Sequence, residues 1–323
     1  MSRRPWLRWE TLLAAAVAAA FVANALLSPY FLNATTLSDA SFNFTEKALV
    51  ALPMALLIIA KEIDISVAAI MALASVAMGY GAIAGWPTPA LVLLGIGVGV
   101  ACGACNGLLV TALRVPSIVA TIGTMSLFRG IAYGVLGDRV MKHYPRGFDY
   151  FGQGYPIGTV SFELLLFLAA ALITGIILHA TTAGRRIYAI GANATAARMS
   201  GVAVDRYRLA LFIATGAASG LASVLLTSRL GSTRPSLAVG WELEIISMVI
   251  LGGVAVAGGR GTILGVVLAA VLLGLVTFGL SLQNIPGIVL SIVVGTLLIV
   301  IVALPAVSAR LATARAARPA RQG

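Results

Sequence analysis

The side chains of this chain that could do chemistry are few, and several of them stand in a polar stretch at 61–66 (KEIDIS) between two apolar ones. This stretch sets the carboxylates Glu62 and Asp64 beside hydrocarbon, where a carboxylate needs water, a partner or a cavity. It is therefore either a tight turn at the membrane surface or a break in a helix that lines a solute path. A cation-coupled transporter would also use such carboxylates.

A second polar stretch, 181–210, is strongly basic, with five arginines against the single acid Asp205. Asn193 is a good N-cap, residues 194–200 suit a short helix, and Gly201 can end that helix in a left-handed turn. The predicted helix is too short to span a membrane. It is either part of an ordinary cytoplasmic loop or a lever on which a separate protein pushes.

Residues for enzyme chemistry are scarce. No G-x-x-x-x-G-K-[ST] stretch occurs, so the chain cannot cradle nucleotide phosphates in that way. His143 and His179 have no other metal-binding side chains near them in the sequence, and we expect no metal site and no catalytic residue. Cys102 and Cys105 lie in an apolar run, where small buried thiols pack like other apolar groups.

Composition indicates the class of protein. Of the 323 residues, 60% are hydrophobic and 10% are charged, and the mean hydropathy is +1.01. A soluble domain carries about 25% charged residues, so we predict an all-α polytopic membrane protein. The net charge of +11 falls mostly in short loops and the tail, which indicates topology signals and not nucleic-acid binding.

Apolar runs of about 20 residues predict the spans. We expect about ten membrane helices with these approximate bounds: 11–27, 48–63, 67–85, 89–111, 117–136, 161–179, 209–227, 243–257, 262–281 and 287–304. The chain then divides into a cytoplasmic segment 1–10, one membrane domain 11–304 with a cytoplasmic loop at 181–208, and a basic cytoplasmic tail 305–323.

Orientation follows from the basic residues. With the N-terminus inside, most Lys and Arg residues fall on the cytoplasmic side, and both termini are then cytoplasmic. Arg129 remains within a predicted span. Because a charge in the bilayer is costly, this arginine must either pair with another group or line a path.

Two patterns concern how the spans are built. Four glycines repeat every four residues on one predicted helix face, as do Gly216 and Gly220, and such stripes let helices approach closely; the four are Gly95, Gly99, Gly103 and Gly107. In addition, 107–124 and 274–296 share a weak pattern that includes Pro116 and Pro286. On the predicted topology the two copies are inverted, a recurring transporter design.

Several stretches together resemble the permease subunit of bacterial ABC importers for monosaccharides, the ribose/xylose/galactose group, which is akin to branched-chain amino acid permeases. They run through residues 60 to 265: 62–67 (EIDISV), 106–110 (NGLLV), 115–117 (VPS), 121–125 (TIGTM), 128–130 (FRG), 184–185 (GR), 189–193 (AIGAN), 196–198 (AAR), 200–201 (SG), Glu244, 252–253 (GG) and 258–259 (GG).

The resemblance implies a non-catalytic subunit in the bacterial inner membrane that works by alternating access. ATP and Mg would bind to separate ATPase subunits, and further partners would be a periplasmic sugar-binding protein, a second permease subunit, identical or similar, and membrane lipid. Coupling to the ATPase would then fall to Arg185, Asn193, Ala197, Arg198, Ser200 and Gly201. The candidates for the sugar path are Glu62, Asp64, Asn106, Thr121 and Thr124.

One departure from the family bears on the substrate. The family usually has GGIDLSVG where this chain has KEIDISVA at 61–68. Chains with an acid at that place, and with a stretch like 43–47 (NFTEK) upstream, are most similar to permeases for rhamnose. We therefore expect rhamnose, with the furanosyl autoinducer of quorum sensing, another pentose or hexose, or a cation-coupled mechanism as alternatives.

Overall fold

The computed structural model describes residues 5–42 and 44–283, together with positions 285, 286, 289, 292, 295 and 296. Over this part of the chain every regular element is a helix. The helices are α1 (Pro5–Leu27), α2 (Ala34–Phe42), α3 (Thr45–Ile59), α4 (Val67–Ile83), α5 (Thr88–Thr111), α6 (Ser117–Leu136), α7 (Tyr150–Gln153), α8 (Phe162–Ala180), α9 (Thr182–Ala192), α10 (Ala194–Met199), α11 (Val204–Leu230), α12 (Trp241–Leu251) and α13 (Ile263–Leu282).

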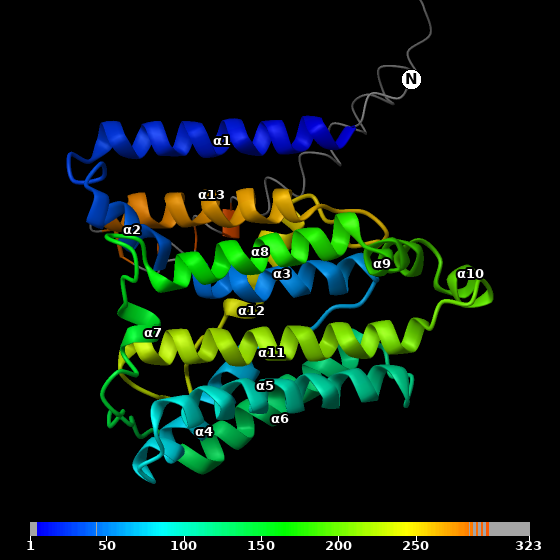
Figure 1. Cartoon of the computed structure of the whole chain (residues 1–323), viewed down its shortest axis with the longest axis horizontal. Coiled ribbons are helices and arrows are strands. Elements are labelled where there is room, and N and C mark those ends of the chain that lie inside the picture. The colour runs from blue at the N-terminus through cyan, green and yellow to red at the C-terminus, as the bar shows by residue number, and fades with distance from the viewer. Residues whose placement is uncertain are drawn as a thin grey trace, which may run out of the picture.

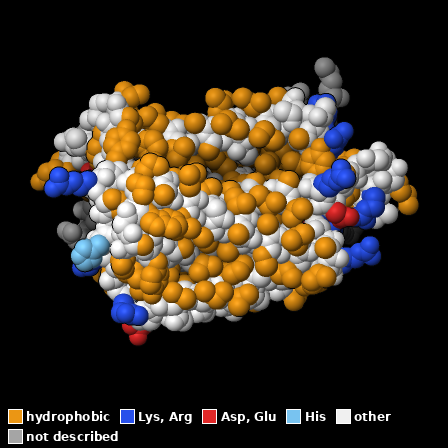
Figure 2. Space-filling view, turned by 60° about the horizontal axis from the view of Figure 1, so that its bottom comes forward, with side chains coloured by type: hydrophobic (Ala, Val, Ile, Leu, Met, Phe, Trp, Pro, Cys, Tyr) orange, Lys and Arg blue, Asp and Glu red, His pale blue; other side chains and the backbone are white. Residues whose placement is uncertain are grey.

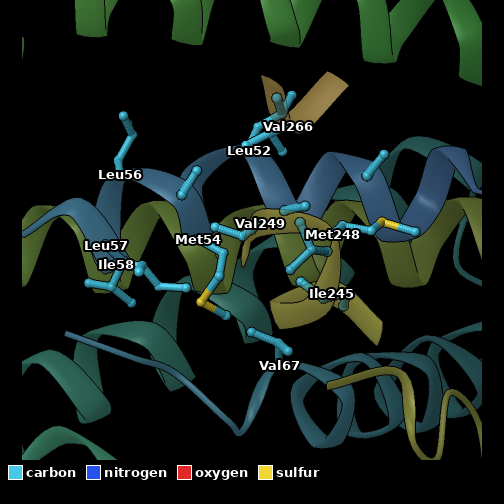
Figure 3. Close-up of a cluster of buried hydrophobic side chains, with 14 of the residues drawn as sticks. Leu52, Met54, Leu56, Leu57, Ile58, Val67, Ile245, Met248, Val249 and Val266 are labelled. Carbon is cyan, nitrogen blue, oxygen red and sulfur yellow. The ribbon is translucent and has the colours of Figure 1, made fainter. Parts of the chain in front are cut away.

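The long helices lie side by side in a bundle around α3 (Figure 1). Helix α3 is buried along almost its whole length and packs against α8, α11, α12 and α13. Its side chains Leu52, Met54 and Leu57 belong to the same buried cluster as Met248 and Val249 of α12 (Figure 3). A helix that is apolar all round belongs in such a central place.

The outside of the bundle carries the composition of a membrane protein. Apolar side chains cover the middle of the molecule, and Lys and Arg gather at its two ends (Figure 2). Helix α1 packs on α13 at one side of the bundle, and only 11% of its apolar window is buried. Exposed apolar surface of this extent is suited to lipid and not to water.

Six described helices are long and apolar enough to cross a membrane, judged by length and composition: α1 from Trp9, α5, α6, α8, α11 and α13. Helices α2 and α3 would together make a seventh span, with a bend of 49° between them. The prediction of an all-α polytopic protein is confirmed. Ten spans are not established, and most of the tenth, 287–304, lies outside the described residues, as does part of the second copy of the repeat.

Helix α1 begins at Pro5, so the segment predicted as a cytoplasmic flank is partly helical, and its place outside the membrane stays a prediction. Two predicted helix boundaries are wrong. The span predicted at 48–63 ends at Ile59. The helix predicted at 243–257 ends at Leu251, because Gly253 takes a left-handed φ of 84°, and its 11 residues reach only roughly 16 Å. Both errors of helix length leave non-helical backbone inside the bundle, at 60–66 and 252–262.

The glycine stripe of α5 lies against α11. A Cβ at Gly99 would stand 2.2 Å from the carbonyl oxygen of Gly216, and one at Gly103 would stand 2.4 Å from that of Phe212. At Gly95 and Gly107 the nearest obstacles are side-chain atoms of Met78 and Leu209, at 2.7 and 2.6 Å. The two backbones are thus too close for any other residue, as expected where small residues drive helix association in lipid.

This contact yields a first prediction. Gly99→Ala should lower the melting temperature of the purified protein, because overpacking a close contact costs about 1–3 kcal/mol and the obstacle is backbone. Gly97→Ala is the matched control, since a Cβ at Gly97 of the same helix meets nothing within 4 Å. Equal melting temperatures for the two variants would contradict the packing argument.

Candidate functional site

Helix α10 projects from one end of the bundle (Figure 1). The side-chain oxygen of Asn193 accepts a hydrogen bond from the backbone N–H of Ala196 at 3.0 Å, and Gly201 ends the turn with a φ of 82°. Ala197 is buried beneath the helix, and the Ser200 hydroxyl donates to the carbonyl of Ala196. The helix predicted at 194–200, its N-cap and its glycine stop are confirmed.

The adjoining helix α9 was not predicted, and the loop expected over 181–208 is mostly helical. The Thr181 hydroxyl caps its first turn by accepting from the N–H of Gly184. Ile187 and Ile190 are buried on one face, whereas Arg185 is exposed. A Thr N-cap followed by apolar residues three apart was a readable signal for this helix.

Helix α9 is held tightly against the bundle near its C-terminal end. A Cβ on Gly191 would stand 1.8 Å from the carbonyl oxygen of Ile59 and 2.4 Å from the backbone nitrogen of Gly259. Gly259 donates its N–H to the same Ile59 oxygen at 2.8 Å. Three segments therefore meet here without intervening side chains: α9, the end of α3 and the 252–262 segment.

Tyr188 adds a second tie between α9 and the same segment. Its hydroxyl donates to the carbonyl oxygen of Gly261 at 2.6 Å, and burial raises the pKa of this phenol to about 12. The hydroxyl therefore keeps its proton throughout the neutral range, and the hydrogen bond is insensitive to pH there.

Two exposed charges of this end, one on α10 and one on α11, form an ion pair. Arg198 donates from Nη2 to both carboxylate oxygens of Asp205, at 2.8 and 3.0 Å, and both side chains are more than half exposed. An exposed pair of this kind contributes about 0–1 kcal/mol. Arg198 thus lies at the surface, and a partner protein that took the place of Asp205 would have to break only a weak contact.

The polar stretch 61–66 forms the break between α3 and α4. Lys61 reverses the chain with a left-handed φ of 68°, and Glu62 forms an ion pair with Nε of Arg208 at 3.0 Å. The N–H of Ile63 donates to the Ser117 hydroxyl at the start of α6. These neighbours place the break at the α9–α10 end of the bundle.

Beyond the turn, the chain is buried in a compact polar network. The Asp64 carboxylate accepts hydrogen bonds from the backbone N–H and the hydroxyl of Ser66, at 2.8 and 2.7 Å. The Asn106 side-chain NH2 donates to Asp64 at 3.2 Å and to Ser66 at 2.8 Å. The Asn106 oxygen has no partner among the described residues. This network fastens the start of α4 to α5.

The structure therefore divides the five predicted path residues. Asp64 and Asn106 meet, whereas the Thr121 hydroxyl bonds mainly to the carbonyl of Ser117 in its own helix, at 2.8 Å. Thr124 likewise bonds to the Thr121 carbonyl at 3.3 Å. Glu62 differs from these four buried groups because it borders a cavity.

That cavity has a volume of about 400 Å³ and lies between the α5–α6 turn and the α10–α11 turn. Its charged lining residues are Glu62, Arg114, Arg198, Asp205 and Arg208. A second hollow of about 570 Å³ is lined by Lys61, Arg208, the end of α9 and the start of α10. The two hollows flank α10, which leaves the short helix accessible for contact with another protein.

The opposite end of the bundle holds charges to which the sequence had assigned no partners. Glu46 of α3 pairs with Arg229 of α11, and Lys47 pairs with Glu244 of α12. Arg129 donates from Nη1 to the carbonyls of Pro235 and Leu237, both at 2.7 Å. Of the two roles left open for Arg129, this contact favours structural pairing.

An all-helical bundle with several apolar helices long enough to span and a short capped helix at one end defines a polytopic membrane protein. The chain belongs to the family described as the branched-chain amino acid transport system / permease component, which matches residues 36–302. The resemblance to permeases of the monosaccharide ABC importer group is confirmed, and the chain is a multi-pass protein of the inner membrane.

Curated relatives carry the name autoinducer 2 import system permease protein LsrD. Those of Escherichia coli K12 and Shigella flexneri are 34% identical over 91% of each chain. The one of Salmonella paratyphi B is 33% identical over 92% of each chain. No solved structure matches this chain.

Proposed function

We propose that this permease is driven by separate ATPase subunits, which bind ATP and Mg and push on α10 from the cytoplasm. The observation that carries the proposal is the contact of Gly191 with Ile59 and Gly259. Through it, a displacement of α9 and α10 is passed on directly to the ends of α3 and of the 252–262 segment. Both are points where a membrane helix is interrupted, and backbone can shift there without breaking a continuous helix.

The residues assigned to coupling have separate tasks in this proposal. Asn193 and Gly201 shape α10 by capping it, and Ala197 anchors it. Arg185 and Arg198 offer charge to the ATPase. Glu62 and Arg208 form the ion pair that borders the cavity at this end, and we assign them to the inner gate. Docking of a periplasmic binding protein would fall to the opposite end, and a second permease subunit would complete the path.

We propose autoinducer 2 or a similar small furanosyl compound as the substrate, with rhamnose as the second candidate. Autoinducer 2 is supported by the relatives' names and their 34% identity. Rhamnose was favoured by the acid at Glu62 and by the stretch 43–47 (NFTEK), which contains Glu46. Both acids, however, are engaged in ion pairs with arginines, which leaves them less suited to hold a neutral sugar.

An uptake assay separates these candidates. Cells with and without this gene are given labelled autoinducer 2 and labelled rhamnose, in the presence and absence of the ATPase partner. We expect gene-dependent uptake of autoinducer 2 that requires the ATPase. Uptake of rhamnose alone would replace the substrate. Uptake abolished by an uncoupler and indifferent to the ATPase would indicate a cation-coupled transporter and remove the proposal.

A second prediction concerns docking. Arg198→Glu should strongly reduce the amount of ATPase that co-purifies, because a carboxylate would face any acid on the partner and would repel Asp205. Membrane insertion should be unchanged, since the side chain is exposed. Asp205→Asn is the matched control: it breaks the same ion pair without reversing a charge and should retain the ATPase. Unchanged co-purification of Arg198→Glu would contradict the role of α10.

A further inference from the structure

Three ionisable side chains from three helices gather at the end of the bundle opposite α10. Arg229 of α11 binds Glu46 of α3 through two contacts, Nε to Oε1 at 2.7 Å and Nη2 to Oε2 at 3.1 Å. Glu163, in the first turn of α8, interacts electrostatically with both of them. The group therefore contains two carboxylates and one guanidinium.

The carboxyl group of Glu163 is unusual for its lack of partners. The residue is 0% exposed, and neither of its oxygens has a hydrogen-bond partner among the residues that the structure describes. The neighbouring Ser161 does not help, because its hydroxyl is engaged with Ser41 and with the backbone N–H of Leu164. Buried polar groups are nearly always hydrogen-bonded, so an unpartnered one points to something that the protein chain does not supply.

Besides Arg229, no cation is available to neutralise Glu163 from the elements packed around α8, as far as the described chain goes. Helix α3 presents Glu46 and also Lys47, which pairs with Glu244. Helix α2 carries Asp39, an exposed acid that accepts from Tyr155, and α7 contributes only Tyr150. Helix α13 has no titratable residue, and the arginines of α9 lie at the other end of the bundle.

A second negative charge here would be buried without compensation. Arg229 already makes a two-point contact with Glu46, and the positive end of the α8 dipole is a weak influence compared with burial. A carboxyl group in such surroundings takes up a proton in preference to remaining charged. We propose that Glu163 is a proton-binding site of this end of the bundle, neutral while Arg229 is bound to Glu46.

The bound proton has a structural consequence. A neutral Glu163 does not compete with Glu46 for the guanidinium, so Arg229 holds α11 against α3. An ionised Glu163 would draw Arg229 towards α8 and weaken that contact. The proton thus stabilises the arrangement in which the end opposite α10 is held together.

Infrared spectroscopy tests the proposal on the full importer complex in lipid nanodiscs. The difference spectrum between wild type and Glu163→Gln should show the loss of a carbonyl band from a protonated carboxylic acid. Asp39→Asn is the matched control and should leave that band in place, because it removes an exposed carboxyl group of α2 at the same end of the bundle. A Glu163→Gln spectrum that retains the band overturns the proposal.

Thermal unfolding in the same nanodiscs gives an independent measurement. Gln has the shape and neutrality of a protonated Glu, so Glu163→Gln should melt at the wild-type temperature. Glu46→Gln should melt roughly 2–4 °C lower or more, because it weakens the bond to a half-buried arginine. A clear change in the melting temperature of Glu163→Gln, in either direction, means that Glu163 is charged and overturns the proposal.

Discussion

Replacing Arg229 with methionine should destabilise the protein by about 3–5 kcal/mol, the cost of leaving one partner of a buried ion pair alone. Glu46 is 1% exposed in its side chain and accepts two hydrogen bonds from this arginine. Methionine retains most of the apolar stem but none of the charge. The effect should be measured as the loss of folded protein on heating in detergent.

A double-mutant cycle separates the ion pair from packing. Glu46→Gln combined with Arg229→Met should be more stable than Arg229→Met alone, because no unpaired charge then remains. An exposed pair gives the reference: breaking Arg198–Asp205 by Asp205→Asn should change stability by less than about 1 kcal/mol. If Arg229→Met proved as mild as Asp205→Asn, the pair would not be buried as the structure has it.

Features set by neighbouring residues could be predicted from the sequence. The Asn193 cap and the Gly201 stop define α10 within nine residues, and the apolar runs define the long spans. The helix at 243–257 could not be bounded in this way, because the run stays apolar through Val254 and Val256. What ends α12 is the left-handed backbone at Gly253, and a glycine in an apolar run does not indicate by itself whether it bends the chain.

Features set by distant residues could not be predicted. Glu46 and Arg229 are separated by 183 positions and Lys47 and Glu244 by 197, so no spacing links them. The same holds for Asp64 and Asn106, which are 42 positions apart. Of these groups, Asp64 was identified from the sequence as a polar group beside hydrocarbon, and it is buried. Whether such a group faces a solute or another helix depends on packing that the linear pattern does not contain.

The two ends of the bundle differ in the kind of contact that holds them. Opposite α10, interhelical ion pairs join α3 to α11 and to α12. At the α10 end, α9 meets the end of α3 and the 252–262 segment through backbone at Ile59, Gly191 and Gly259, and the ion pair Glu62–Arg208 lies at the same end. Backbone contacts of this kind are rigid and transmit small displacements, whereas ion pairs can exchange partners. The contact beneath α9 is thus rigid where the ATPase would push, while the ion pairs at each end leave room for a rearrangement.

Gly191→Ala should therefore reduce transport by about tenfold or more, the effect of a cost of about 1.4 kcal/mol. Its Cβ would lie 1.8 Å from the Ile59 oxygen and 2.4 Å from the Gly259 nitrogen. Neither obstacle is a side chain that could rotate away, so α9 must move off both α3 and the 252–262 segment.

The ATPase should still co-purify with this variant, because the surface of α10 is unchanged. Loss of transport with the ATPase still bound would show that movement no longer passes from α9 to the bundle. The measurement compares the uptake of labelled substrate with the amount of ATPase that co-purifies. Gly175→Ala in α8 is the control, since a Cβ there meets nothing within 4 Å. Normal uptake by Gly191→Ala would show that force does not pass through this contact, and the role of α9 would have to be abandoned.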